Sequence, residues 1–357
     1  LRMLPSGDAA GKSRRYRALR SLFSVRHATC RLASGTRMSA RTLPLGIDIG
    51  ATRLRVLEAH VTAQGPRLRA AAVREISSGA ASSGSIRDAD YVAALIDDAL
   101  VELGTRERRC VTAIGEPDAL LRSVRFPKMT SGERERSARF EAQRHVDFPI
   151  DEALVRVHPV DRSNDVWALG IARTTAVSTR IAALRAAKLK VLAVDHEACA
   201  FGRALPRFDA IVDIGFQRVS LHVMTREAPA TFQVFNGGAD ITRGIERDLS
   251  VDESTAEKRK RILGTAGAGE RARTVLTADI AALIRSARAT HAISRVGLVG
   301  NGARLPGLAA DIEAATGALC EVPVSDTLRS EGYPEDVVRS SAPDWTLAAG
   351  LALWVQP

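Results

Sequence analysis

Apolar and polar residues alternate on both sides of a glycine in two segments of the chain, residues 45–59 and 210–223. Alternation with a period of two is typical of short strands, and a glycine between two such runs allows the tight turn that joins them. Each segment contains an aliphatic residue, an aspartate, a second aliphatic residue and the glycine: Ile47-Asp48-Ile49-Gly50 and Val212-Asp213-Ile214-Gly215. The pattern therefore predicts two matching strand–turn–strand hairpins, far apart in the sequence.

Helical spacing of apolar residues marks other parts of the chain. Residues 90–103 predict a helix that stops at Gly104, a residue that readily takes the backbone conformation of a helix end. The region 109–204 predicts a small unit of mixed strands and helices, in which Thr130 or Ser131 caps a helix. Further expected elements are strands at 231–235 and 296–299, and helices at 254–261, 278–290 and 345–355.

Two glycine-rich turns follow the later strands. They are Gly237-Gly238 and Gly300-Asn301-Gly302, and alone each predicts no more than a turn. In this order after two hairpins, they become candidate contacts for the base and sugar of a nucleotide. Glu257 and Lys260 lie three residues apart and share a face of one predicted helix, either beside that ligand or as a solvated salt bridge.

The hairpins have the chemistry of a phosphate site. A glycine turn presents backbone N–H groups to phosphate oxygens because no Cβ blocks the approach. Asp48 and Asp213 stand at the strand ends, where a carboxylate can hold Mg²⁺ through the waters of the ion. Two hairpins from two lobes would clamp phosphates across a cleft between the lobes. The alternative is that both are structural strand ends.

The positive charge of the chain is concentrated at its start. The net charge is +10, but residues 1–41 contain ten of the 51 basic residues and one of the 41 acidic ones, so the rest is nearly balanced. This distribution argues against nucleic-acid binding by the body of the protein. We expect residues 1–41 to be a basic leader, either disordered or upstream of a true start at Met38, or else a basic amphipathic helix at an anionic membrane surface.

Several other classes of function are disfavoured. The four cysteines and seven histidines have no metal-ligand spacing, and no Ser/His/Asp or Cys/His arrangement has a local signature. The longest apolar run, residues 345–355, is too short to span a bilayer. We therefore expect a cytoplasmic protein. No catalytic base can be identified, which favours weak or absent turnover.

Motifs that run in order along residues 45–355 resemble the PilM family of type IV pilus assembly proteins, relatives of the cell-division protein FtsA within the actin/Hsp70/sugar-kinase superfamily. They are Gly46–Gly50 with Arg55–Glu58, Phe126–Met129, Arg139–Ala142 with Asp147–Ile150, Val194–Glu197, Gly237–Thr242, Ala256–Lys260, Ala303–Leu308 and Ala348–Leu353. The resemblance implies an α/β, actin-like (ribonuclease H-like) two-lobed fold with an inserted α+β domain of the SHS2 or 1C type. It divides the chain into lobe I at 45–108 and 338–357, the insertion at 109–204, and lobe II at 205–337.

The resemblance also implies a function. A PilM-like protein would bind ATP and Mg²⁺, dock the cytoplasmic tail of a bitopic PilN-like membrane protein within the pilus alignment complex, and so lie at the inner membrane, with self-association possible. The metal would be held through water by Asp48 and Asp213. The expected nucleotide-binding residues are Asp48, Gly50, Ala51, Thr52, Arg53, Arg55, Asp213, Gly215, Arg218, Gly237, Gly238, Glu257, Lys260, Gly300, Asn301 and Gly302.

The chain also departs from the family pattern. Phe216-Gln217-Arg218 stands where small or hydroxyl residues follow the second glycine, Arg53 where Ser or Thr is usual, and Asn301 where a glycine is common. Phe216 could narrow the site, whereas Arg218 could pair with a phosphate as a charged donor. These changes are expected to affect hydrolysis more than binding. A small-molecule kinase of the same superfamily and an FtsA-like division protein remain the alternative functions.

Overall fold

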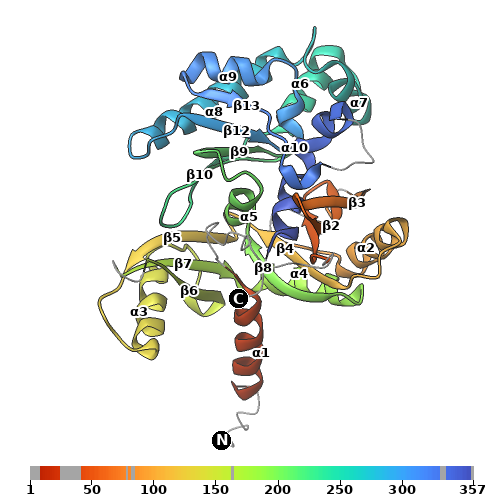
Figure 1. Ribbon diagram of the computed structural model, residues 1–357. Coiled ribbons are helices and arrows are strands. Elements are labelled where there is room, and N and C mark those ends of the chain that lie inside the picture. The colour runs from red at the N-terminus through yellow and green to blue at the C-terminus, as the bar shows by residue number, and fades with distance from the viewer. Residues whose placement is uncertain are drawn as a thin grey trace, which may run out of the picture.

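The computed structural model describes residues 9–24, 42–77, 79–81, 85–161, 165–329 and 335–354. This part of the chain contains two five-stranded sheets, one in each of two lobes, and a three-stranded sheet beside the first lobe. Figure 1 shows the second lobe above the first, with helix α10 between them.

The first predicted hairpin organises the sheet of lobe I. Strands β1 (Leu45–Ile49), β2 (Arg53–Thr62) and β3 (Gly65–Glu75) are antiparallel neighbours, and β4 (Arg109–Ile114) and β8 (Lys190–His196) extend the sheet in parallel beyond β1. The strand order is β3-β2-β1-β4-β8. The central strands are buried along most of their length, since helices cover the sheet.

The second hairpin repeats this architecture. Strands β9 (Ala210–Ile214), β10 (Val219–Val223) and β11 (Ala230–Val234) are antiparallel, and β12 (Arg295–Val299) and β13 (Leu319–Glu321) continue in parallel from β9. The order β11-β10-β9-β12-β13 matches that of the first sheet strand for strand. The two lobes are therefore topological duplicates, each with its hairpin at the same place.

The inserted unit is smaller than the region 109–204 predicted for it. Its sheet has the order β5-β7-β6, from strands β5 (Ala119–Arg125), β6 (Ala153–Asp161) and β7 (Val166–Arg173). Helix α3 (Ser131–Gln143) covers it and begins with a capping box between Thr130 and Glu133, and a short 3-10 turn, η1 (Ile150–Glu152), precedes β6. The expected boundaries fail at both ends because β4 and β8 pair with each other in the sheet of lobe I.

Helices pack on the two larger sheets. In lobe I, α2 (Ala89–Leu103) ends at Gly104 and packs against α4 (Thr174–Ala186), while α5 (Glu197–Ala204) follows β8 directly. In lobe II, α6 (Gly238–Leu249) packs against α7 (Glu253–Leu263) and α8 (Glu270–Arg288), and α8 packs against α9 (Leu308–Thr316). The short 3-10 turns η2 (Asn301–Arg304) and η3 (Asp326–Leu328) complete the fold.

Helix α10 (Glu335–Ala352) joins the two lobes, because it contacts β1, β2, β4 and α5 of lobe I and β12 and η2 of lobe II. Its small residues allow close approach: a Cβ at Gly46 would overlap the carbonyl oxygen of Ala348, and one at Gly350 would overlap that of Ala200. From lobe II, the N–H of Gly300 donates to the carbonyl oxygen of Pro343 at 2.9 Å.

Part of the basic leader folds onto the body, contrary to the expectation of disorder. Residues 9–22 form helix α1, and the following Phe23 is fully buried and pairs in parallel with Val194 on the outer strand β8. Arg20 donates to the carbonyl oxygen of Val155 at 2.9 Å and forms an ion pair with Glu135 at 2.8 Å. The apolar side of the C-terminal end of α1 thus packs between lobe I and the inserted sheet. The N-terminal end of α1 extends away from the body (Figure 1). Residues 1–8 and 25–41 lie outside the described residues.

Candidate functional site

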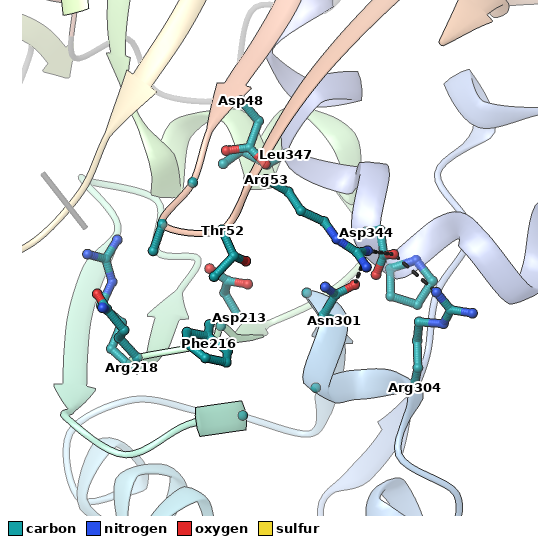
Figure 2. A pocket seen from close by; sticks show the side chains of 18 of the residues that line it. Asp48, Thr52, Arg53, Asp213, Phe216, Arg218, Asn301, Arg304, Asp344 and Leu347 are labelled. Carbon is teal, nitrogen blue, oxygen red and sulfur yellow. Dashed lines mark hydrogen bonds and ion pairs between the residues drawn. The ribbon is translucent and has the colours of Figure 1, made fainter. Parts of the chain in front are cut away.

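A cleft of about 450 Å³ lies between the lobes, a volume that suits a nucleotide-sized ligand. Both hairpins, the start of α6, one face of α7, the turn η2 and the middle of α10 line it. Figure 2 shows Asp48 and Thr52 entering from the lobe I side and Asp213, Phe216 and Arg218 from the lobe II side.

The first hairpin is closed by a hydrogen bond from the N–H of Gly50 to the carbonyl oxygen of Arg53, at 2.9 Å. Asp48 is the next-to-last residue of the central strand β1 and accepts a hydrogen bond from Nη1 of Arg55 at 3.1 Å. Burial raises the pKa of Asp48 above its ordinary value, and the Arg55 guanidinium opposes that shift. The carboxylate at this strand end is therefore already paired.

The second hairpin has the same geometry. The N–H of Gly215 donates to the carbonyl oxygen of Arg218 at 3.0 Å. Burial, followed by the negative charge of Glu197, raises the pKa of Asp213 to about 7. Phe216 lines the cleft as the sequence predicts, and the ammonium group of Lys260 lies 5.6 Å from the centre of its ring.

Arg218 does not stand free in the cleft. Its Nη2 donates to both carboxylate oxygens of Glu197, at 2.9 and 3.1 Å, and both residues are buried. Glu197 is the first residue of α5, directly after β8, so its carboxylate lies where the strand end meets the cleft. Both carboxylate oxygens of Glu197 are therefore already engaged by Arg218 at the edge of the cleft.

A third guanidinium lies beneath the first hairpin. Arg180 from α4 is 3% exposed and donates to the carbonyl oxygen of Ile49 at 3.1 Å. Its Nε has no hydrogen-bond partner among the described residues. Burial lowers the pKa of Arg180, and the charges of Glu197 and then Asp48 oppose the shift. The buried end of the cleft thus carries three carboxylates and three guanidinium groups.

The first glycine turn fits tightly against the second hairpin. A Cβ at Gly237 would lie 2.7 Å from the carbonyl oxygens of Gly215 and Phe216, so a larger residue would force the two segments apart. The N–H of Gly238 donates to the carbonyl oxygen of Gly215 at 3.0 Å. The N–H of Ala239 donates to the carbonyl oxygen of Phe216 at 2.8 Å. The start of α6 is therefore fixed to the hairpin.

Glu257 and Lys260 form a connected pair rather than a solvated one. Lys260 Nζ contacts Glu257 Oε2 at 2.6 Å, the carbonyl oxygen of Gly238 at 2.8 Å and Oγ1 of Thr242 at 2.7 Å. Burial lowers the pKa of Lys260, and the hydrogen bond from its ammonium group to Glu257 opposes the shift. The pair ties α7 to α6 while both side chains line the cleft.

The second glycine turn carries a polar cluster at the junction with α10. Gly300 has a φ of +79°, and a Cβ there would overlap Oδ1 of Asp213. Asp344 of α10 forms ion pairs with Arg304 at 3.2 Å and with Arg53 at 3.7 Å (Figure 2). One carboxylate therefore contacts an arginine from each lobe.

The cleft brings together all but one of the expected site residues. The exception is Gly237, which supports the second hairpin from behind. The residues that line the cleft are Asp48, Gly50, Ala51, Thr52, Arg53, Arg55, Asp213, Gly215, Arg218, Gly238, Glu257, Lys260, Gly300, Asn301 and Gly302.

Further residues line the cleft that were not among the expected site residues, and they include Arg180, Glu197, Phe201, Arg304 and Asp344. Of these residues, only Glu197 has a sequence context that could have predicted its place at the site. It directly follows a buried strand and begins a helix, and such a position lies at the carboxyl edge of a sheet. Arg304 lies on the turn that the glycine motif begins, whereas Arg180, Phe201 and Asp344 come from helices that only the tertiary fold places at the cleft. Within the described residues, no group of three or more His, Cys, Asp or Glu side chains could hold a metal ion, and no helix is both long and apolar enough to cross a bilayer.

Two duplicated lobes with a glycine hairpin from each facing one cleft define an actin-like protein. Solved structures share this fold. EutJ, an ethanolamine utilization protein from Carboxydothermus hydrogenoformans, has a TM-score of 0.58 and 15% identity, over 98% of this chain and 100% of that one. MreB5 of Spiroplasma citri bound to AMPPNP has a TM-score of 0.50 and 12% identity, over 88% and 95% of the two chains.

The chain belongs to the PilM family: the family described as type IV pilus assembly protein PilM matches residues 46–356. A solved PilM-PilN type IV pilus biogenesis complex is similar over 87% of this chain and 97% of that one, with 27% identity and a TM-score of 0.77. No curated protein matches the chain.

Proposed function

We propose that this protein is an actin-like, nucleotide-binding scaffold of type IV pilus assembly that docks the cytoplasmic tail of a PilN-like membrane protein. The family match across residues 46–356 carries the assignment to pilus assembly. The likeness to a PilM-PilN complex supports the choice of partner. Through such a tail the protein would be held at the inner membrane.

Nucleotide binding is supported by the geometry of the cleft. Glycine hairpins from both lobes converge on one volume of about 450 Å³, and its lining includes arginine and lysine side chains together with carboxylates. Some actin-like relatives of the same fold hold a nucleotide, as MreB5 of Spiroplasma citri holds AMPPNP. We infer that ATP occupies the cleft with its phosphates between Gly50 and Gly215.

Turnover of the nucleotide should be weak. Glu197 lies at the cleft, in a position from which a carboxylate could activate a water molecule. However, Arg218 donates hydrogen bonds to both of its carboxylate oxygens. The same pairing argues against the alternative of a small-molecule kinase, which needs an available carboxylate base close to the phosphates.

Partner docking can be tested with a synthetic peptide. A fluorescent copy of the N-terminal cytoplasmic tail of the PilN-like protein encoded in the same genome is titrated with the full chain and followed by anisotropy. We expect saturable binding that a scrambled peptide of equal length and charge does not show. Equal binding of the two peptides, or of neither, would remove the pilus partner from the account but leave the fold and the cleft unchanged.

A further inference from the structure

The two hairpins carry an arginine at the same position, three residues after the glycine. Arg53 follows Gly50 and Arg218 follows Gly215, and in each hairpin the arginine carbonyl oxygen accepts the glycine N–H. The repeated topology of the lobes makes these arginines counterparts, one on each side of the cleft. Both side chains line the cleft, as Figure 2 shows.

The carboxylates at the cleft do not fit a hydrated Mg²⁺. Asp48 is held by Arg55 at 3.1 Å, and both oxygens of Glu197 are held by Arg218. A divalent ion at these carboxylates would lie close to the guanidinium groups, and like charges in a desolvated site repel strongly. Of the two carboxylates expected to hold the ion, Asp48 is thus already paired with a protein cation, and burial raises the pKa of Asp213 to about 7.

Guanidinium groups can take the place of a metal as the counter-charge of phosphates. Arginine presents N–H groups in a planar fork that matches phosphate oxygens, and charge-assisted hydrogen bonds of this kind are about twice as strong as neutral ones. Arg53 and Arg218 approach the cleft from opposite lobes, Arg53 paired with Asp344 at 3.7 Å and Arg218 with Glu197 at 2.9 Å. A bound polyphosphate would lie between two guanidinium groups whose positions these carboxylates fix.

We propose that the cleft binds the polyphosphate of a nucleotide without a divalent metal, with Arg53 and Arg218 supplying the positive charge that Mg²⁺ would otherwise supply. This inference rests on the proposed function, because it specifies the form in which the nucleotide binds. Arg218 has a second consequence, since it keeps the carboxylate of Glu197 from coordinating an ion. The arginine in the second hairpin would therefore set both the metal independence and the low turnover.

The test is isothermal titration of ATP into the full chain at fixed ionic strength, once with excess MgCl₂ and once with EDTA. We expect dissociation constants that agree within about threefold. Binding that is about tenfold or more weaker in EDTA overturns the inference and leaves the proposed nucleotide site standing. No binding in either buffer removes the nucleotide site itself, and the inference with it.

Arg218→Ser tests the role of the residue. It releases Glu197, so MgCl₂ should now strengthen ATP binding by about tenfold or more relative to EDTA. Arg247→Ser, an exposed change on α6 that removes the same charge away from the cleft, should keep the wild-type ratio. A ratio for Arg218→Ser equal to that of the control contradicts the proposal.

A double variant guards against misfolding, because removing Arg218 alone leaves a buried carboxylate without its partner. Arg218→Ser with Glu197→Gln removes both charges and keeps the site neutral. If Arg218 contacts phosphate, the double variant binds ATP about tenfold more weakly than wild type in EDTA. If the pair is only structural, the double variant binds as wild type does, and that result overturns the proposal.

Discussion

Asp213 shows how single residues set the character of the cleft. Its carboxyl group is buried between the lobes, near the carboxylates of Glu197 and Asp48 and the guanidinium of Arg218. A buried carboxyl group binds its proton more tightly because burial disfavours the charged form. The pKa of about 7 in the folded protein lies above the value near 4 expected when the chain unfolds.

The raised pKa of Asp213 makes stability depend on pH in a defined direction. Between about pH 4 and pH 7 the folded state keeps a proton that the unfolded state loses, so the contribution of this group to stability is lost as pH rises. Asp213→Asn should therefore raise the free energy of unfolding by about 2 kcal/mol at pH 8, with a gain that shrinks toward pH 4. Urea denaturation across this range measures it, and a gain that does not vary with pH would contradict the assignment.

Gly300 offers a second prediction at this scale. Its φ of +79° disfavours a side chain, and an added Cβ would overlap Asp213. Gly300→Ala should lower the free energy of unfolding by about 3 kcal/mol and weaken ATP binding. Gly317→Ala is the matched control, since Gly317 has a similar φ of +64° and open space around it. The control should cost about 1 kcal/mol, and equal losses would show that the overlap with Asp213 has no effect.

The sequence predicted the site residues whose role depends on the local backbone conformation. It did not predict the site residues that tertiary structure brings to the cleft. Gly50 and Gly215 close hairpins whose strands directly adjoin them in the sequence. The alternating pattern around each glycine was therefore sufficient to predict the hairpin. Arg180 comes from a helix in the middle of lobe I, and its approach to Ile49 spans 131 residues. No local pattern could have shown that contact, or the pairing of Arg218 with Glu197.

Among elements, α1 differs most from the expectation. The end of this helix provides a buried side chain, Phe23, which extends the sheet of lobe I beyond β8. The basic composition favoured a leader that is disordered or upstream of the true start, with a basic amphipathic helix at a membrane surface as the alternative. In the structure, Leu19 and Phe23 recur at helical spacing and bury one face of the helix end against the body. The apolar spacing therefore outweighed the charge.

Phe23→Ala tests whether α1 is an integral element. Removing a fully buried phenylalanine should lower the free energy of unfolding by about 3 kcal/mol, because it leaves a cavity and exposes the edge of β8. Val101→Ala, on the exposed side of α2, should change it by less than about 0.5 kcal/mol. Guanidinium denaturation of both variants compares them, and a Phe23→Ala value no larger than the control would mean that α1 does not pack on the body in solution.

Other elements show why strand prediction was incomplete. The two hairpins were predicted with nearly correct bounds, because alternation and a glycine turn are both local signals. Strand β3 was missed because its arginines and alanines blur the alternation, and its partly exposed side chains follow no simple pattern. Strand β8 was missed because its burial comes from pairing with β4, about 80 residues earlier in the chain.

At the scale of the whole molecule, the duplication of the lobes creates the site. Each lobe alone offers one hairpin, and α10 holds the two in register through its contacts with both sheets. Asp344 on that helix joins Arg53 of lobe I to Arg304 of lobe II. A ligand bound between the hairpins would therefore restrain both lobes at once, whereas a ligand on one lobe would not.

Hydrogen–deuterium exchange of the full chain, with and without saturating ATP, tests the central claim of an interlobe nucleotide site most directly. We predict slower exchange with ATP in both hairpin segments, residues 46–54 and 211–219, and at the start of α6, with little change in the inserted sheet. Protection confined to one lobe, or unchanged exchange in both hairpins at a concentration where ATP binds, would contradict the account.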